Sequence, residues 1–174
     1  MRRREAGLAL VALPLLLLPN ITSANQPPKA LAALLPGLRP WGSGEFRRFG
    51  FLVYEATLWA GESEQPTPPL ALGLTYKRNI EGKAIAEASV DQMRRFDASD
   101  AQLKVWGQQM LALFPDVKPG DRIVGLQLAD RAGFFLNEQP IGEIDDPAFA
   151  RAFFAIWLDP RTSEPSLRTA LLKR

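Results

Sequence analysis

Hydrophobic positions along this chain follow a spacing of two over several segments, and turn residues mark where those segments end. Residues 70–78 alternate between an apolar and a more polar face, which predicts a half-buried strand. Residues 45–60 carry aromatic and β-branched side chains on both faces, which predicts a strand, or a bent pair of strands, near the centre of a sheet. Residues 121–128 predict another strand, and residues 133–144 predict a hairpin whose turn begins at Asn137.

Segments with helical spacing alternate with these strands. Residues 84–95 have helical composition, and Ser99 with Gln102 forms the pattern of a capping box before an amphipathic helix that stops at Pro115. Asp146 stands directly before a proline, which is typical of a helix start, and one more short helix follows. The residues predicted to face the core from these helices are Ile85, Ala88, Met93, Leu103, Trp106, Met110, Leu113, Phe114, Phe149, Phe153, Ile156, Trp157, Leu167, Leu171 and Leu172.

The order of these elements predicts one domain of the α+β class with an antiparallel sheet, because strands and helices follow each other in separate groups. No internal repeat or second domain boundary interrupts the pattern. Residues 25–40 are rich in proline and predict a flexible leader with about one turn of helix. The domain is therefore predicted to occupy residues 41–174.

Residues 1–24 have the layout of a secretory signal peptide. Three arginines follow Met1, residues 6–18 are apolar apart from a glycine and a proline, and small residues precede the expected cleavage site. A membrane-spanning helix needs about 20 apolar residues, whereas this run is shorter and contains Pro14. We expect cleavage after residue 24, a periplasmic or secreted mature protein, and no stable membrane anchor after cleavage.

Charge and composition exclude several classes of function. The chain has 21 basic and 19 acidic residues, and removal of residues 1–24 leaves 18 of each, so the excess positive charge of a nucleic-acid-binding protein is absent. The chain also has no cysteine and no histidine. The absence of histidine removes the commonest general base, the Ser-His and Cys-His nucleophiles, and histidine metal sites. The sequence predicts no catalytic residue, no cofactor and no metal site.

Several motifs occur together in an order and spacing that are typical of one family. They are Gly42-Ser43-Gly44-Glu45-Phe46-Arg47, Val53-Tyr54-Glu55-Ala56, Phe114-Pro115-Asp116-Val117-Lys118-Pro119-Gly120-Asp121-Arg122, the hairpin strands Phe134-Phe135-Leu136-Asn137 and Ile141-Gly142-Glu143-Ile144, Phe149-Ala150-Arg151-Ala152-Phe153-Phe154-Ala155-Ile156-Trp157-Leu158, and Leu167-Arg168. Over residues 41–172 the chain resembles the bacterial chalcone isomerase-like family. The resemblance implies an open-faced β-sandwich, in which a large curved antiparallel sheet is covered by helices on one face.

The resemblance also implies an apolar ligand between the sheet and the helices. The superfamily contains isomerases, which close a flavanone ring, and non-catalytic members that bind fatty acids. In both groups an arginine near the start of an early strand binds an oxygen or carboxylate of the ligand. Arg47 corresponds to this arginine and Arg48 is the alternative, because successive strand residues point to opposite faces. Tyr54 and Tyr76 are the two tyrosines of the chain; each is either a hydrogen-bond donor to the ligand or a core residue with its hydroxyl at the rim.

The isomerases carry a tyrosine near the ligand ketone, and residues 79–86 of this chain contain none. We therefore expect a non-catalytic protein that binds a small apolar ligand, such as a fatty acid, through Arg47, Tyr54 and Tyr76. Two alternatives stay open: an isomerase or lyase for an unsaturated ketone that uses one of the two tyrosines instead, and a partner-binding protein with a filled core. An open cavity that ends at the arginine favours the first function, and a solid core favours the last.

Overall fold

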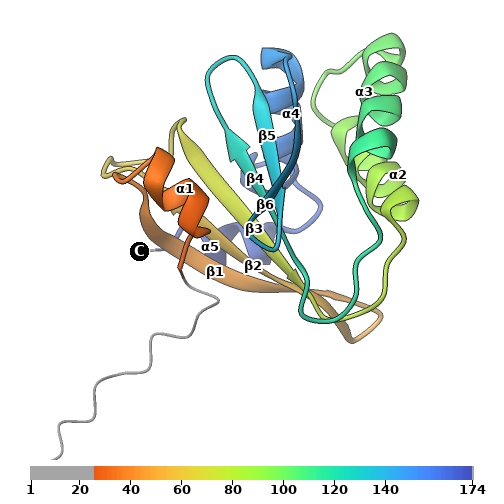
Figure 1. Ribbon diagram of the computed structural model, residues 1–174. Coiled ribbons are helices and arrows are strands. Elements are labelled where there is room, and N and C mark those ends of the chain that lie inside the picture. Colours follow the sequence, from red (N-terminus) through yellow and green to blue (C-terminus); the bar gives the residue numbers. More distant parts are fainter. Residues whose placement is uncertain (1–25, 174) are drawn as a thin grey trace, which may run out of the picture.

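Six strands form one curved antiparallel sheet in the computed structural model, which describes residues 26–173 (Figure 1). Each strand pairs with the next one along the chain, in the order β1-β2-β3-β4-β5-β6. The predicted signal peptide, residues 1–24, lies outside the described residues. The strands are β1 (Arg39–Arg48), β2 (Phe51–Ala60), β3 (Leu70–Tyr76), β4 (Arg122–Gln127), β5 (Ala132–Leu136) and β6 (Gln139–Ile144).

Four helices cover one face of the sheet, and a fifth lies against the opposite face (Figure 1). Helices α2 to α5 bury their apolar side chains against the sheet in one large core, whereas α1 belongs to a separate, smaller core. The α+β class and the antiparallel sheet under a layer of helices are thereby confirmed. The helices are α1 (Lys29–Leu34), α2 (Gly82–Met93), α3 (Asp100–Leu113), α4 (Pro147–Leu158) and α5 (Pro165–Leu171).

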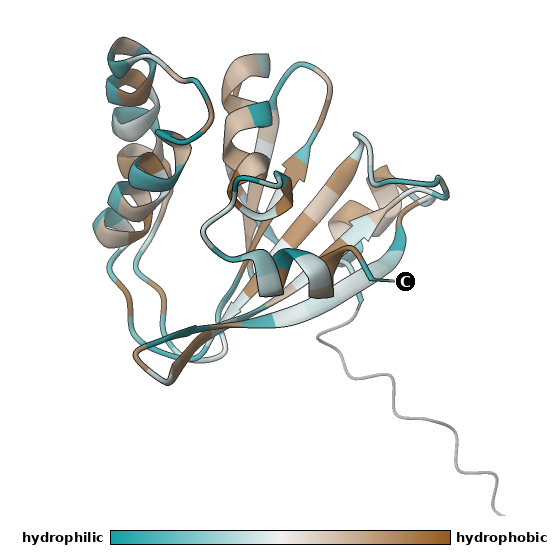
Figure 2. Ribbon diagram, turned by 180° about the vertical axis from the view of Figure 1, so that it is seen from behind, coloured by the Kyte–Doolittle hydropathy of each residue, from teal (hydrophilic) through white to brown (hydrophobic). Residues whose placement is uncertain are grey.

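Helix α4 supplies the aromatic centre of the large core, and it is among the most hydrophobic elements in Figure 2. Phe149, Phe153 and Trp157 follow each other at four-residue intervals and are all buried. The ring of Phe153 meets the ring of Phe134 on β5 edge to face, with 5.2 Å between the centroids. The helix starts where predicted, because the Asp146 carboxylate accepts hydrogen bonds from two backbone N–H groups of the first turn.

Helix α3 begins with the predicted capping box. The Ser99 hydroxyl accepts a hydrogen bond from the backbone N–H of Gln102 (3.2 Å), and the Gln102 side chain accepts one from the backbone N–H of Ser99 (3.0 Å). The predicted stripe through Leu103, Trp106 and Met110 is buried. Within residues 26–173, no helix is long and apolar enough to cross a membrane.

Two of the hairpins close through two-residue turns with positive φ angles at both positions. The predicted β5–β6 hairpin is confirmed, with φ of 46° at Asn137 and 76° at Glu138. The segment predicted as a strand or a bent pair of strands is a hairpin of β1 and β2, which turns at Phe49 (φ 51°) and Gly50 (φ 81°). Asparagine and glycine are common in such turns, whereas phenylalanine is not.

The proline-rich segment that the sequence predicts as a flexible leader is ordered over most of its length. It contains α1 and the first residues of β1, and it buries Leu31 and Leu38 against Trp59 on the outer face of the sheet. The backbone N–H of Lys29 donates a hydrogen bond to the Glu138 carboxylate (2.5 Å). This six-residue helix consists of good helix formers but is too short to be stable alone, so it gains its order from long-range burial, which local sequence does not reveal.

Helix α5 lies directly on strand β1 because two glycines let the backbones approach. A Cβ atom at Gly42 would overlap the carbonyl oxygens of Ala170 and Leu171, and a Cβ atom at Gly44 would lie 2.8 Å from side-chain carbons of Ala170 and Leu167. The glycines of the Gly42-Ser43-Gly44 motif therefore form the seat of the last helix. This close packing also fixes the loop between α4 and α5, which borders the cavity described next.

Candidate ligand-binding cavity

An apolar cavity of about 280 Å³ lies between the sheet and helices α2 and α4. A row of rings crosses the sheet at its floor: Phe46 of β1 pairs with Tyr54 of β2, which pairs with Tyr76 of β3. The first two rings stack with 4.9 Å between their centroids, and the two tyrosine rings meet edge to face at 6.0 Å. The cavity is lined by Phe46, Arg48, Val53, Tyr54, Leu74, Tyr76, Ile80, Ala84, Ile85, Ala88, Ser89, Gln92, Phe114, Ile123, Phe153, Ile156, Trp157, Ser163 and Glu164.

The arginine at this cavity is Arg48, so the predicted role of Arg47 does not agree with its position. The Arg47 guanidinium pairs with the Glu45 carboxylate at 2.8 Å and donates a longer bond to the Gly50 carbonyl, away from the cavity lining. Alternation along β1 places Phe46 and Arg48 on the cavity face and Arg47 on the other. Arg48 is exposed at the mouth, and it has no carboxylate partner among residues 26–173.

The structure brings the two predicted tyrosines together inside the cavity, with different surroundings. The Tyr54 hydroxyl accepts a hydrogen bond from Trp157 Nε1 (3.1 Å), so its own proton remains available for donation. Tyr76 is 3% exposed, and within the described residues its hydroxyl has no hydrogen-bond partner. Both phenol groups can therefore donate to an oxygen atom of a ligand.

Burial also fixes the protonation state of these phenols. Removal from water raises the pKa of Tyr76 well above its usual range, and the Tyr54 phenol nearby acts in the same direction. Burial likewise raises the pKa of Tyr54, although the hydrogen bond from Trp157 lowers it; Glu164 raises it further. Both hydroxyl groups are thus protonated at neutral pH, where they serve as hydrogen-bond donors and not as bases.

Polar side chains from α2 and from the loop before α5 form a polar rim of the cavity. The Ser163 hydroxyl donates a hydrogen bond to the Gln92 side chain at 2.8 Å and so links this loop to α2. The Ser89 hydroxyl donates to the Ile85 carbonyl of its own helix. The sequence did not predict these polar lining residues. Their signal is the spacing of Ile85, Ser89 and Gln92, which follow each other at steps of four and three residues and therefore share one helix face.

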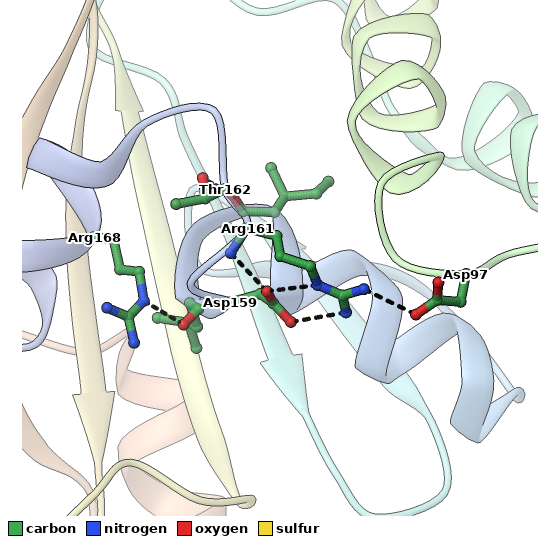
Figure 3. A network of polar contacts seen from close by, with 7 residues as sticks. Asp97, Asp159, Arg161, Thr162 and Arg168 are labelled. Atoms are coloured by element: carbon green, nitrogen blue, oxygen red, sulfur yellow. Dashed lines mark hydrogen bonds and ion pairs between the residues drawn. The ribbon is translucent and has the colours of Figure 1, made fainter.

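A network around Arg161 holds the loop after α4 in place (Figure 3). The guanidinium bonds the carboxylates of Asp159 and Asp97, and Arg168 of α5 donates a 2.7 Å hydrogen bond to the Leu158 carbonyl. Both carboxylates also border a more polar cleft of about 300 Å³ between α3 and α4. Because Arg161 and these carboxylates already bond one another, they are less available to a ligand than the hydrogen-bond donors of the apolar cavity are.

The arrangement suits a ligand that is apolar along most of its length and carries an oxygen-bearing head. Apolar side chains from the sheet, α2 and α4 would surround the body, while Arg48 and the two phenols offer donors to the head. The volume is near the lower end of the range of about 300–1,000 Å³ that is usual for small-molecule sites. Among residues 26–173, no group of three or more acidic residues is placed to hold a metal ion.

Comparison with known proteins places the chain in a family. The family model described as chalcone isomerase-like matches residues 42–173. The chain belongs to the chalcone isomerase-like family. The resemblance inferred from the sequence motifs is therefore confirmed, and it extends over nearly all the described residues of this chalcone isomerase-like protein.

Two relatives fit this assignment. An uncharacterised protein of Haemophilus influenzae is 32% identical over 136 residues, which are 77% of this chain and 67% of that protein. The crystal structure of a fatty-acid binding protein of Arabidopsis thaliana is similar with a TM-score of 0.62 and 12% sequence identity, and the match covers 78% of this chain and 87% of that one. At this low identity the plant structure supports the chalcone isomerase-like fold and nothing finer.

Proposed function

We propose that this chalcone isomerase-like protein is a non-catalytic binding protein for a small apolar molecule with a carboxylate or similar oxygen-bearing head, such as a fatty acid. The observation that carries the proposal is the open cavity between the sheet and helices α2 and α4, whose lining is largely apolar and includes Arg48, Tyr54 and Tyr76 as donors. A partner-binding protein with a filled core would not need this space, because packed protein interiors contain few voids larger than a water molecule.

Arg48 and the tyrosines give the head group its binding partners in this proposal. The exposed Arg48 guanidinium has no carboxylate of its own within the described chain and can bind one from the ligand through two parallel hydrogen bonds. Tyr54 and Tyr76 would donate to the same head or to a second oxygen atom. The Arabidopsis neighbour, which shares the fold, is named as a fatty-acid binding protein, and we carry that class of ligand over as part of the proposal.

Export completes the proposal. The sequence of residues 1–24 supports a cleaved signal peptide, and the absence of cysteine from the chain is compatible with an oxidising compartment. We propose that the mature protein works in the periplasm or outside the cell. N-terminal sequencing of the protein purified from its own cells tests this, and a mature N-terminus that retains residues 1–24 would count against it.

Native mass spectrometry of the protein, purified without detergent, tests the binding function. We expect a bound mass that organic extraction identifies as an acid with an apolar body. Ala88 lines the cavity from an exposed position on α2, so Ala88→Trp would extend a ring into the cavity and lower the occupancy. Ala112→Trp is the matched control, because Ala112 is an exposed helical alanine on α3 outside the cavity lining.

The outcomes separate the candidate functions. Full occupancy in Ala88→Trp, or no bound molecule in any preparation and no uptake of added fatty acids, would refute the binding function at this cavity. Turnover of an unsaturated ketone by the wild type, lost in Tyr54→Phe or Tyr76→Phe, would favour the isomerase or lyase alternative.

A further inference from the structure

Two phenylalanine side chains project from the tip of the β1–β2 hairpin. Phe49 is 88% exposed and Phe51 is 61% exposed, and they stand on either side of Gly50. Single exposed hydrophobic residues are common on proteins and need no explanation. Two large aromatic side chains at one turn, with no helix or loop covering them, are a localised apolar patch.

The backbone makes Phe49 more unusual still. It occupies the left-handed region with φ of 51°, where a bulky side chain is disfavoured. The β5–β6 hairpin provides a comparison within the same chain, because its turn has nearly the same φ angles but carries the polar pair Asn137 and Glu138. Phe49 is therefore unfavourable both for its conformation and for its exposure, and its cation–π contact with the exposed Arg48 offsets only part of this.

Cationic side chains flank both rings. The Arg48 guanidinium lies 5.5 Å from the centroid of the Phe49 ring, and the Arg78 guanidinium lies 5.1 Å from that of Phe51. Neither arginine has an ion pair within residues 26–173, whereas Arg47 on the same hairpin is neutralised by Glu45. The tip thus combines exposed aromatic rings with unpaired positive charge.

This combination is complementary to the surface of an anionic lipid bilayer. Aromatic residues are favoured at the boundary between head groups and acyl chains, and arginine side chains bind the phosphate groups above that boundary. Apolar partner proteins would also cover the rings, but they would not favour two unpaired guanidinium groups beside them. The charges therefore select the anionic lipid surface.

We propose that the tip of the β1–β2 hairpin docks reversibly on anionic lipid bilayers, with Phe49 and Phe51 in the head-group region and Arg48 and Arg78 on lipid phosphates. Arg48 also lines the cavity mouth, and the hairpin tip lies at the same end of the sheet as the β3–α2 connection, in the lower part of Figure 1. Docking would bring the mouth close to the bilayer, so that an apolar ligand crosses little water. This last link rests on the proposed function, whereas docking itself does not.

The absence of cysteine from the chain allows a direct test with one fluorophore per molecule. Phe49→Cys and, as the control, Val105→Cys on the exposed surface of α3 are labelled with an environment-sensitive dye in the full chain. On addition of phosphatidylglycerol-containing vesicles we expect a blue shift and a rise in intensity at position 49 and no change at position 105. Phosphatidylcholine vesicles should give a weaker response.

Charge and ring variants complete the test. With the dye at position 49, Arg48→Gln and Arg78→Gln should each weaken partition onto anionic vesicles about fivefold. Phe49→Asn with Phe51→Thr should reduce sedimentation with vesicles relative to wild type. Fatty-acid affinity in solution should stay unchanged, because neither ring lines the cavity, and the thermal unfolding temperature should not fall, because asparagine suits the positive φ at position 49.

Identical dye responses at positions 49 and 105, or no response to any vesicle, would overturn the docking proposal. If the hairpin tip does not bind vesicles but crosslinks to a protein through position 49, the docking proposal is overturned in favour of a protein partner. If docking fails while solution affinity for fatty acids holds, only this inference is lost; if affinity fails while docking holds, only the binding function is lost.

Discussion

The adjacent arginines of β1 allow the binding site to be tested with variants that differ by one position. In Arg48→Ala the ligand carboxylate loses its charged partner at the cavity mouth. A hydrogen bond to a charged group contributes about 1.5–3 kcal/mol when it is well buried. Because Arg48 is exposed to solvent, screening reduces the expected loss to about 1 kcal/mol, which is roughly a fivefold increase in Kd.

Arg47→Ala is the control, because it removes the same side chain from the opposite face of the strand. Its ion pair with Glu45 joins two half-exposed groups, with 52% and 48% of the side chains accessible. The variant should therefore lose at most about 1 kcal/mol of stability and retain its affinity. Displacement of a fluorescent fatty acid by unlabelled acids measures both variants in one assay.

Methyl esters separate the charge from the apolar body of the ligand. Arg48→Ala should bind a fatty-acid methyl ester as well as the wild type does, since the ester has no negative charge for the guanidinium to neutralise. Equal affinity of Arg47→Ala, Arg48→Ala and wild type for the free acid would refute the assignment of Arg48. A larger loss in Arg47→Ala would restore the position that the sequence motifs suggested.

Three further predictions concern the support of the cavity. Gly42→Ala should lose about 1–3 kcal/mol in urea unfolding because its Cβ would overlap the α5 backbone, whereas Gly37→Ala, which has open space, should change little. Tyr76→Phe should leave stability within about 0.5 kcal/mol but weaken ligand binding in the displacement assay. Burial opposes the ionisation of Asp146, but hydrogen bonds from Trp106 and from the first turn of α4 outweigh the effect of burial and lower its pKa. The ionised carboxylate therefore stabilises the folded state above the unfolded pKa of about 3.9, and this stabilisation is lost as the pH falls through the lower pKa of the folded state. Acid unfolding of Asp146→Asn should accordingly depend less on pH, and an unchanged acid transition would contradict this.

Local sequence signals predicted much of the fold because they satisfy backbone groups over short distances. The capping box at Ser99 and the start of α4 at Asp146 are formed by side chains within three residues of the backbone atoms that they bind. The β5–β6 turn was predicted because asparagine tolerates the positive φ that Asn137 adopts. The family motifs then supplied the arrangement of the sheet and its helices. The core positions on α4 were also predicted, since an apolar stripe has to face the sheet.

The parts that the sequence analysis missed depend on distant contacts or on the face of a strand. The helix containing Leu31 is ordered by burial against Trp59, more than twenty positions away along the chain. The choice between Arg47 and Arg48 required knowing that Phe46 points into the cavity, and a register shift between β1 and β2 lies at this point. Phe49 was assigned to a strand because an exposed phenylalanine is not a turn residue by composition.

The seat of α5 on the glycines of β1 has a consequence for how the chain acquires its native state. The first strand of the meander is completed by α5, which follows all the other described elements along the chain, so a chain emerging residue by residue cannot bury this seam until those elements have been synthesised. Neighbouring strands can pair early, since their contacts are short in sequence, whereas this closing contact carries the largest loop-closure entropy. The seam between β1 and α5 is thus the expected point of late assembly and of first opening under stress.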